Sequence, residues 1–358
     1  MRRSLASAPA VSVEASSICL LRLSALGDAT HVVPLVRSIQ RERPAARITW
    51  IIGKAEAAML AGLEDVEFIV FDKKTGWAGV RALRRALAGR RFDVLLQMQL
   101  ALRANLLSSL VRAERRIGYD RARSKEGHGL VINARIAPGG HHVIDALARF
   151  GEALGVPQGR VEWRLPVPAE AQAWAAAQWP ADEPVLLISP CSSHRLRNWA
   201  PERYAAVAAV AQRRGWRVVL CGGPSRLERD TADAILAALP GRDAVLDLVG
   251  RDTFKRFLAM AARADLLLSP DSGPVHMANA MGTRVIALHA CTDRERSGPY
   301  SDRRWSPNRY DEAARRFLGR PAAELPWGKH IEFPGVMDLI GVDEVVERFE
   351  ACAADLGR

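Results

Sequence analysis

The stretch that most constrains the fold of this chain is residues 264–289, ADLLLSPDSGPVHMANAMGTRVIALH. It opens with an apolar run of three leucines, which a parallel strand requires when both of its faces are covered. A polar turn over 269–274 follows, and its second proline suits the first turn of a helix. We expect that helix to end at Gly282, a typical C-cap residue, before a second buried strand over 285–288. This order of elements predicts a parallel βαβ arrangement.

The polar turn in this stretch is a candidate phosphate site. Free backbone N–H groups and the positive dipole end at the start of a helix bind anions. Its candidate residues are Asp271, Ser272, Gly273 and, one turn into the helix, His276. Ordinary strand-to-helix turns share this pattern and a lone helical histidine is usually structural, so the turn alone leaves both interpretations open.

The same alternation of strands and helices runs through most of the chain. Apolar runs predict strands at 18–23, 48–52, 68–71, 92–97 and 115–119, and again at 185–189, 216–220 and 245–248. A length of 358 residues exceeds one typical core, and five prolines between 156 and 184 indicate a linker. We therefore predict two doubly wound α/β domains that face each other across a cleft. The predicted parts are a disordered leader over 1–16, domains over 17–165 and 166–335, and a C-terminal helical segment over 336–358 that packs back toward the first domain.

Composition narrows the class of protein. No stretch has the roughly 18 uninterrupted apolar residues of a membrane helix, and the leader lacks the apolar core of a signal peptide. The five cysteines form no CxxC pair, and four lie in or beside apolar runs. We expect a cytoplasmic protein with reduced core cysteines, no metal site and no cofactor.

Charge is distributed unevenly along the chain. Residues 1–165 contain 26 Lys and Arg against 15 Asp and Glu, whereas residues 166–358 contain 25 of each kind. A basic first domain indicates an anionic partner: nucleic acid, an anionic membrane surface or a phosphorylated substrate. No basic motif interleaved with aromatic residues and no helix-turn-helix signature occurs, so we expect no nucleic acid partner. The candidate contacts, which could also be a solvated basic face, are Arg81, Arg84, Arg85, Arg115, Arg116, Arg121, Arg123 and Lys125.

Three other strand-end loops carry polar residues. Asp28 lies where the first strand leads into its helix, where a carboxylate can act as a general base or simply cap the helix. Ser192, Ser193 and Arg197 make a plausible anion clamp, or else a solvated loop. Glu228 follows a Cys-Gly-Gly-Pro turn and could bind ribose hydroxyls.

Taken together, these motifs resemble glycosyltransferase family 9, the lipopolysaccharide heptosyltransferases. The match lies in LLRLSALGDATHVVPLVRSIQ, in the Ser-Ser…Arg-Asn-Trp segment, in CGGP and in SPDSGPVHMANAMGTRVIALHACTDRERSGPY. The resemblance implies a GT-B fold of two Rossmann-like domains. It also implies an ADP-heptose donor, a lipid-anchored core oligosaccharide as the anionic glycolipid acceptor, and inverting transfer without a metal.

The resemblance also assigns roles to residues. Asp28 corresponds to the catalytic base, and the first domain binds the acceptor at the cytoplasmic surface of the inner membrane. The second domain binds the donor: Ser192, Ser193, Arg197, Asp271, Ser272, Gly273 and His276 for the diphosphate and sugar, and Glu228, Asp252 and Thr253 for the nucleoside. Two features depart from the family pattern, namely Arg197 in place of a common lysine and the segment 301–335.

We expect a monomer. Another nucleotide sugar such as a UDP-sugar, or a non-enzymatic nucleotide- or nucleic-acid-binding protein, remains the alternative.

Overall fold

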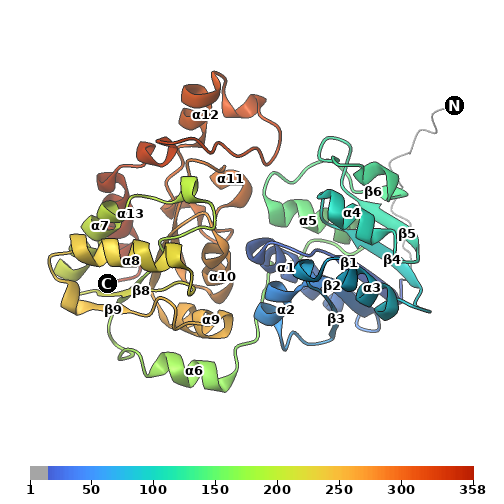
Figure 1. Cartoon of the computed structure of the whole chain (residues 1–358), viewed down its shortest axis with the longest axis horizontal. Helices are drawn as coiled ribbons and strands as arrows, with labels where there is room; N and C mark the ends of the chain where they lie inside the picture. The colour runs from blue at the N-terminus through green and yellow to red at the C-terminus, as the bar shows by residue number, and fades with distance from the viewer. Residues whose placement is uncertain (1–14) are drawn as a thin grey trace. The chain divides into compact units, whose positions relative to one another are not determined.

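The computed structural model describes residues 15–358. The chain divides between Pro166 and Val167 into two compact units, the N-terminal unit and the C-terminal unit. Each unit is built around a parallel sheet (Figure 1). The division lies one residue from the predicted boundary, and all but the last two residues of the predicted leader fall outside the described residues.

The N-terminal unit alternates strands and helices along the chain. Its strands are β1 (Ser17–Leu21), β2 (Arg47–Gly53), β3 (Val66–Phe71), β4 (Phe92–Gln97), β5 (Ala113–Gly118) and β6 (Ala134–Arg135). Its helices are α1 (Leu26–Glu42), α2 (Lys54–Leu60), α3 (Trp77–Ala86), α4 (Leu102–Ser108) and α5 (Val143–Glu152), with short 3₁₀ turns η1 (Lys73–Thr75) and η2 (His128–Leu130).

The N-terminal sheet has the strand order β3-β2-β1-β4-β5-β6, and all of its pairs are parallel. Helices cover both faces, as near-continuous apolar strands require. On one face, Leu83 of α3 and Leu107 of α4 pack with Leu21 and Leu95 of the central strands. On the other, α1 packs against α5. β1 and β4 are neighbours in the sheet, but the chain continues from β1 to β2 on one side and from β4 to β5 on the other. This reversal of strand order creates a switch point at the carboxyl ends of β1 and β4.

The C-terminal unit repeats this construction. Its strands are β7 (Val185–Ile188), β8 (Arg217–Leu220), β9 (Val245–Asp247), β10 (Leu266–Pro270) and β11 (Arg284–Leu288). Its helices are α6 (Ala169–Ala176), α7 (Pro201–Arg213), α8 (Arg226–Ala238), α9 (Phe254–Arg263), α10 (Gly273–Met281), α11 (Arg294–Ser297), α12 (Tyr310–Leu318) and α13 (Val342–Asp355). The 3₁₀ turns are η3 (Arg195–Arg197), η4 (Arg242–Ala244), η5 (Arg303–Trp305), η6 (Ala322–Glu324) and η7 (Val336–Leu339).

The last helix belongs to the core of the C-terminal unit. α13 contacts α7 and β11, and its Val345, Phe349 and Cys352 are buried in the same cluster as Leu186 and Leu268. The sequence analysis expected this segment to turn back toward the N-terminal domain. The apolar face of α13 is used within the C-terminal unit, because three buried side chains at helical spacing need a continuous core to cover them, and the expected packing toward the N-terminal domain stays a prediction.

The structure also contains helices that the apolar pattern did not indicate. α2 begins directly after β2 with no intervening loop. α6 lies inside the proline-containing stretch predicted as a linker, where it packs against α9. Its helical side chains are mostly alanines, which favour a helix but give little contrast between its faces.

Candidate active site

The switch point of the C-terminal sheet organises the predicted donor residues. The strand order is β11-β10-β7-β8-β9, so β7 and β10 are neighbours whose following loops diverge. Ligands of open α/β sheets bind outside the carboxyl ends of the strands at such a point. The loop after β7 carries Ser192 and Arg197, and the loop after β10 carries Asp271. Parallel pairing thus brings together residues that lie far apart in the sequence.

The loop after β10 is built as the sequence predicted. Ser272 is the N-cap of α10, Pro274 occupies its first turn, and the Ser272 and Ser269 hydroxyl oxygens are 3.0 Å apart. Gly282 closes the helix with a φ of 90°, a left-handed conformation that favours glycine. The first-turn N–H groups of α10 are therefore positioned as an anion site at the sheet edge.

Asp271 fixes this loop through contacts with its neighbours. Its carboxylate lies 3.5 Å from Nε2 of His276 and accepts a hydrogen bond from Oγ of Ser297 at 3.2 Å. Burial works against ionisation, but the neighbouring His289 and the hydrogen bond with His276 hold the pKa of Asp271 well below its usual range. Burial lowers the pKa of His289, whose Nδ1 lies 3.1 Å from the Thr292 hydroxyl. Asp271 is thus an ionised, buried anchor that orients His276.

The loop after β7 is held by its own hydrogen bonds. The N–H of Ser192 donates to Oδ1 of Asn198 at 2.7 Å, and the Ser192 hydroxyl accepts from the N–H of His194 at 3.1 Å. Ser193 is exposed. Arg197 is mostly buried, and its Nε donates to Oε1 of Glu332 at 2.6 Å. The predicted clamp cation therefore has a carboxylate partner that the sequence analysis did not find.

The predicted nucleoside residues come together at the ends of β8 and β9. Glu228 accepts hydrogen bonds from the N–H of Gly223 at 2.8 Å and from the Ser225 hydroxyl at 2.6 Å. The Ser225 hydroxyl caps α8 by accepting from the N–H of Glu228 at 3.3 Å. The Thr253 hydroxyl caps α9 by accepting from the N–H of Arg256 at 3.3 Å. Burial, with a contribution from the nearby Glu228, raises the pKa of Asp252 to about 7. Two carboxyl groups thus lie close together in this part of the unit.

Asp28 lies at the switch point of the N-terminal sheet, in the first turn of α1. Its carboxylate accepts from the N–H of Ala25 at 3.1 Å and pairs with Nη2 of Arg22 at 2.5 Å. Arg22 is anchored in turn by the carbonyls of Ser24 at 2.9 Å and Met98 at 2.5 Å. The side chain of Asp28 remains 31% exposed. The carboxylate is therefore oriented by an arginine and a backbone amide while one side stays accessible to solvent.

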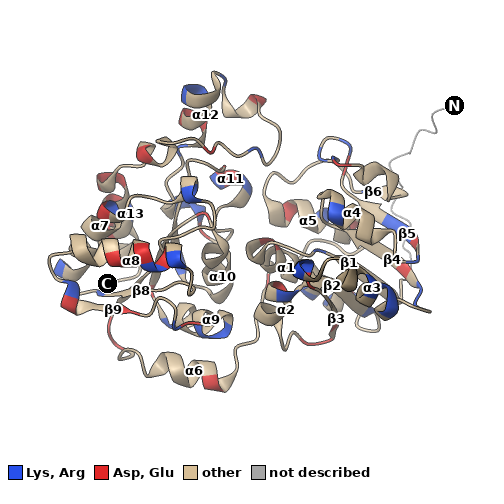
Figure 2. Ribbon diagram, viewed as in Figure 1, with Lys and Arg blue, Asp and Glu red and all other residues tan. Residues whose placement is uncertain are grey.

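A pocket of about 730 Å³ lies in the N-terminal unit beside this switch point. Its walls come from the carboxyl ends of β1 and β2, from η1 and from the start of α4, and its cations are Lys54, Lys73, Lys74 and Arg103. Figure 2 shows basic residues over α2, α3 and α4 in this unit. The buried Glu56 also lines the pocket, and burial raises its pKa. The sequence analysis did not single out these residues, and two of them, Lys54 and Glu56, lie on α2, a helix that it did not predict.

The predicted acceptor cations divide into two groups. Arg81, Arg84, Arg85, Arg121 and Lys125 are exposed, and Arg115 is half-buried on β5.

Arg116 and Arg123 instead hold the fold together. Arg116 donates to the carbonyls of Val131 at 2.6 Å and of Val111 and Ser108 at 2.7 Å each. Arg123 pairs with Asp120 at 3.3 Å. Both guanidinium groups are used by the protein itself, so we correct their assignment from acceptor contacts to structural residues.

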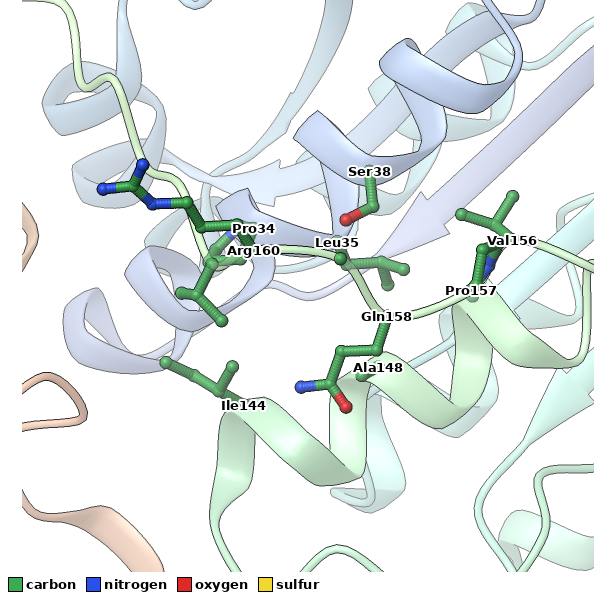
Figure 3. Close-up of a pocket in the computed structure, with 12 residues that line it drawn as sticks. Pro34, Leu35, Ser38, Ile144, Ala148, Val156, Pro157, Gln158 and Arg160 are labelled. Carbon is green, nitrogen blue, oxygen red and sulfur yellow. The ribbon is translucent and has the colours of Figure 1, made fainter.

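A second cavity of the N-terminal unit is too small for a substrate. It lies between α1, α5 and residues 156–161, and its wall includes Leu35, Ile144 and Val156 (Figure 3). Its volume of about 20 Å³ is of the order of one water molecule.

No group of three or more His, Cys, Asp or Glu side chains among residues 15–358 is arranged to hold a metal ion. No helix within the same residues is both long enough and apolar enough to cross a bilayer.

Comparison with known proteins identifies the family. Residues 80–316 match the sequence profile of glycosyltransferase family 9 (heptosyltransferase). The lipopolysaccharide core heptosyltransferase OpsX of Haemophilus influenzae is 37% identical over 331 residues, which cover 92% of this chain and 95% of that protein. The chain therefore belongs to glycosyltransferase family 9, as its motifs predicted. It is a glycosyltransferase.

Solved structures agree on the fold. A family 9 glycosyltransferase from Veillonella parvula superimposes with a TM-score of 0.78 at 18% identity, over 97% of this chain and 99% of that one. Escherichia coli heptosyltransferase WaaC with ADP gives a TM-score of 0.66 at 20% identity, over 79% and 90% of the two chains. The same enzyme with ADP-2-deoxy-2-fluoro heptose gives 0.64 at 20% identity, over 77% and 90%. The predicted class, two doubly wound α/β domains of the GT-B type, is confirmed.

Proposed function

We propose that this protein transfers a heptose from ADP-heptose to the lipopolysaccharide core, inverts the anomeric centre and needs no metal. The observation that carries the proposal is the β7–β10 switch point, where the start of α10 and the loop over 192–197 follow neighbouring strands at the same edge of the sheet. A sugar nucleotide needs such a site for its diphosphate. The 37% identical relative is named as a core heptosyltransferase, and the E. coli relative was solved with ADP and an ADP-heptose analogue.

In this proposal the C-terminal unit binds the donor. Backbone N–H groups at the start of α10, which Ser272 and Gly273 begin, bind the diphosphate with Arg197 and the two serines 192 and 193. His276, oriented by Asp271, faces the same site. Glu228, Asp252 and Thr253 contact the nucleoside. These cations and amides stabilise the charge that develops on the leaving diphosphate.

Asp28 is the proposed general base. An acceptor hydroxyl loses its proton to the Asp28 carboxylate while its oxygen forms a bond to the anomeric carbon. The bond from that carbon to the diphosphate oxygen breaks on the opposite face, and its electron pair leaves with ADP. Arg22 and the amide of Ala25 orient the carboxylate, which is what a base in such a step requires.

The N-terminal unit binds the acceptor in this proposal. The pocket with Lys54, Lys73, Lys74 and Arg103 is suited to an acidic saccharide. The adjacent α3 presents Arg81, Arg84 and Arg85, and its first residue, Trp77, is 80% exposed. An exposed tryptophan beside basic residues favours the interface of an anionic bilayer, so we propose a cytoplasmic enzyme that associates peripherally with the inner membrane.

Replacing the base tests the chemistry. For Asp28→Asn we expect kcat to fall about 10²–10⁴-fold, because general base catalysis typically contributes that much, while the Kd for ADP changes less than about twofold. The exposed Asp65→Asn is the matched control, expected to keep wild-type turnover. Transfer from ADP-heptose to a core acceptor and calorimetric ADP binding are the two measurements. Substantial turnover by Asp28→Asn would exclude Asp28 as the base.

Nucleotide identity is tested by thermal stability. A ligand that binds only the folded protein stabilises it by about 2.7 kcal/mol at a hundredfold excess over its Kd. We therefore expect ADP to raise Tm by several degrees, and UDP, GDP and CDP to raise it less. A larger rise with UDP would replace the proposed donor with a UDP-sugar.

A further inference from the structure

We propose that residues 327–332 position two arginines, Arg197 and Arg296, as a paired clamp for the donor diphosphate. This segment belongs to the stretch 301–335 that departs from the family pattern. The inference rests on the proposed function and deepens it, because it names the residues that orient the clamp. It depends on contacts of Trp327, His330 and Glu332 within the C-terminal unit.

Arg197 is held along one edge of its guanidinium group. Its Nε donates to Oε1 of Glu332 at 2.6 Å, and its Nη2 lies 2.9 Å from Nδ1 of His330. Within residues 15–358, its Nη1 makes no hydrogen bond to the protein. Because guanidinium nitrogens lie in one rigid plane, fixing one edge determines where the remaining donors point. Glu332 and His330 therefore orient Arg197 and leave Nη1 for a ligand.

Arg296 is held by stacking. Its guanidinium carbon lies 4.4 Å from the centre of the Trp327 ring, and the structure pairs it with no carboxylate among the described residues. Its Nε is buried without a hydrogen-bond partner in the same part of the chain. If Gly328 carried a side chain, its Cβ would lie only 3.1 Å from Nε of Arg296. The absence of a side chain at Gly328 therefore lets the backbone of residues 327–332 pack closely against Arg296. The two Nη nitrogens of this half-buried side chain make no hydrogen bond within residues 15–358, so they, and not the covered Nε, are the donors available to an anionic ligand.

His330 contacts Arg197 and lies within electrostatic range of Arg296 and of Asp271 in the loop after β10. The charges of Arg197, Arg296, Glu332 and Asp271 all act on its ring. Burial and the two guanidinium groups lower the pKa of His330 to about 4. It is therefore neutral near pH 7, and its Nδ1 can accept from Arg197 without adding a third positive charge.

The same segment is firmly attached to the unit. The N–H of Ile331 donates to the carbonyl of Cys291 at 2.9 Å, and the Tyr310 hydroxyl donates to the carbonyl of Lys329 at 2.7 Å. Ser297, next to Arg296, donates to Asp271 at 3.2 Å. A diphosphate offers several oxygens to planar donors, and two oriented guanidinium groups beside the start of α10 fit that chemistry.

The test separates phosphate binding from nucleoside binding. Calorimetry or competition gives the Kd of each variant for ADP and for adenosine. For Arg296→Gln we expect ADP binding to weaken about 10–100-fold, as loss of a charge-assisted hydrogen bond predicts, and adenosine binding to change less than about twofold. Arg320→Gln, an exposed arginine of the same unit, is the matched control and should bind both like the wild type.

Positioning is tested by conservative variants. Trp327→Ala should weaken ADP binding about fivefold or more, and Trp327→Phe should restore most of it, because an aromatic face is what orients Arg296. Glu332→Ala should weaken ADP binding more than Glu332→Gln, which keeps an acceptor for Nε of Arg197.

The possible results are distinguishable. A selective loss of ADP binding in Arg296→Gln, with the order of effects above, supports the clamp. Unchanged ADP binding, or an equal loss for ADP and adenosine, overturns it while leaving the proposed donor in place. A wild-type protein that binds no ADP would overturn the donor proposal itself and, with it, the clamp.

Discussion

At the scale of single residues, similar acidic side chains after parallel strands have different charge properties. Asp271 is buried, yet hydrogen bonds and neighbouring histidines keep its pKa well below the usual range. At Asp252 a backbone hydrogen bond and the charge of Arg256 compensate only in part, so burial, with a contribution from Glu228, raises its pKa to about 7. Asp271 was predicted from its position after a strand, and Asp252 through the family resemblance. Their protonation states depend on neighbours that no local pattern specifies.

Asp252 should make stability depend on pH. Its pKa is raised from 3.8 to about 7, so between these values the folded protein holds a proton that the unfolded chain has released. Stability therefore falls as pH rises through this window. Asp252→Asn removes the effect. After allowance for solvent screening, we expect it to gain about 1 kcal/mol, or 2–4 °C in Tm, at pH 8, and almost nothing at pH 4.

Thermal melts at pH 4, 6 and 8 measure the difference in Tm between Asp252→Asn and the wild type. An increase of this difference with pH is the sign that Asp252 titrates. Asp243→Asn, at a fully exposed carboxylate, is the control and should change Tm equally at each pH. A constant difference between Asp252→Asn and the wild type would show that Asp252 does not titrate in this range.

At the scale of elements, the strand–turn–helix unit of residues 264–289 follows its sequence closely. β10, α10 and β11 lie within one or two residues of their predicted bounds, and Gly282 ends the helix in the left-handed conformation. Leucines, proline and glycine carry this information locally. α2 and α6 were missed because neither shows a clear apolar face or a separating loop.

Gly282 gives a clean measure of what this helix end contributes. Nothing lies within 4 Å of a Cβ built at Gly282, so Gly282→Ala causes no steric clash with neighbouring residues. The loss of stability therefore comes only from holding an alanine backbone at a φ of 90°. We expect a loss of about 1–2 kcal/mol in the free energy of unfolding, and about half of that for Gly282→Asn, because asparagine tolerates this conformation better. Urea unfolding of the three proteins measures the differences. An alanine variant as stable as the wild type would contradict the assignment of this cap.

At the scale of the whole molecule, the number of basic residues in a segment does not tell how many of them are exposed on its surface. The excess of basic residues lies in residues 1–165. Folding divides these cations into exposed side chains such as Arg84 and donors used by carbonyls, such as those of Arg116. The pocket lysines, which the sequence analysis did not single out, gather only because parallel pairing places the ends of β2 and β3 beside β1.

The sequence by itself determined the fold class, the family, most strands and the strand-end positions of the predicted site residues. These follow from apolar runs, turn residues and helix caps, whose physical effects act over a few neighbouring positions. Only the tertiary structure decided which side chains meet. Glu332 reaches Arg197 across 135 positions, and Arg22 reaches Met98 across 76. Such contacts depend on strand order and chain closure, which bring distant loops to one sheet edge and leave no periodic trace in the sequence.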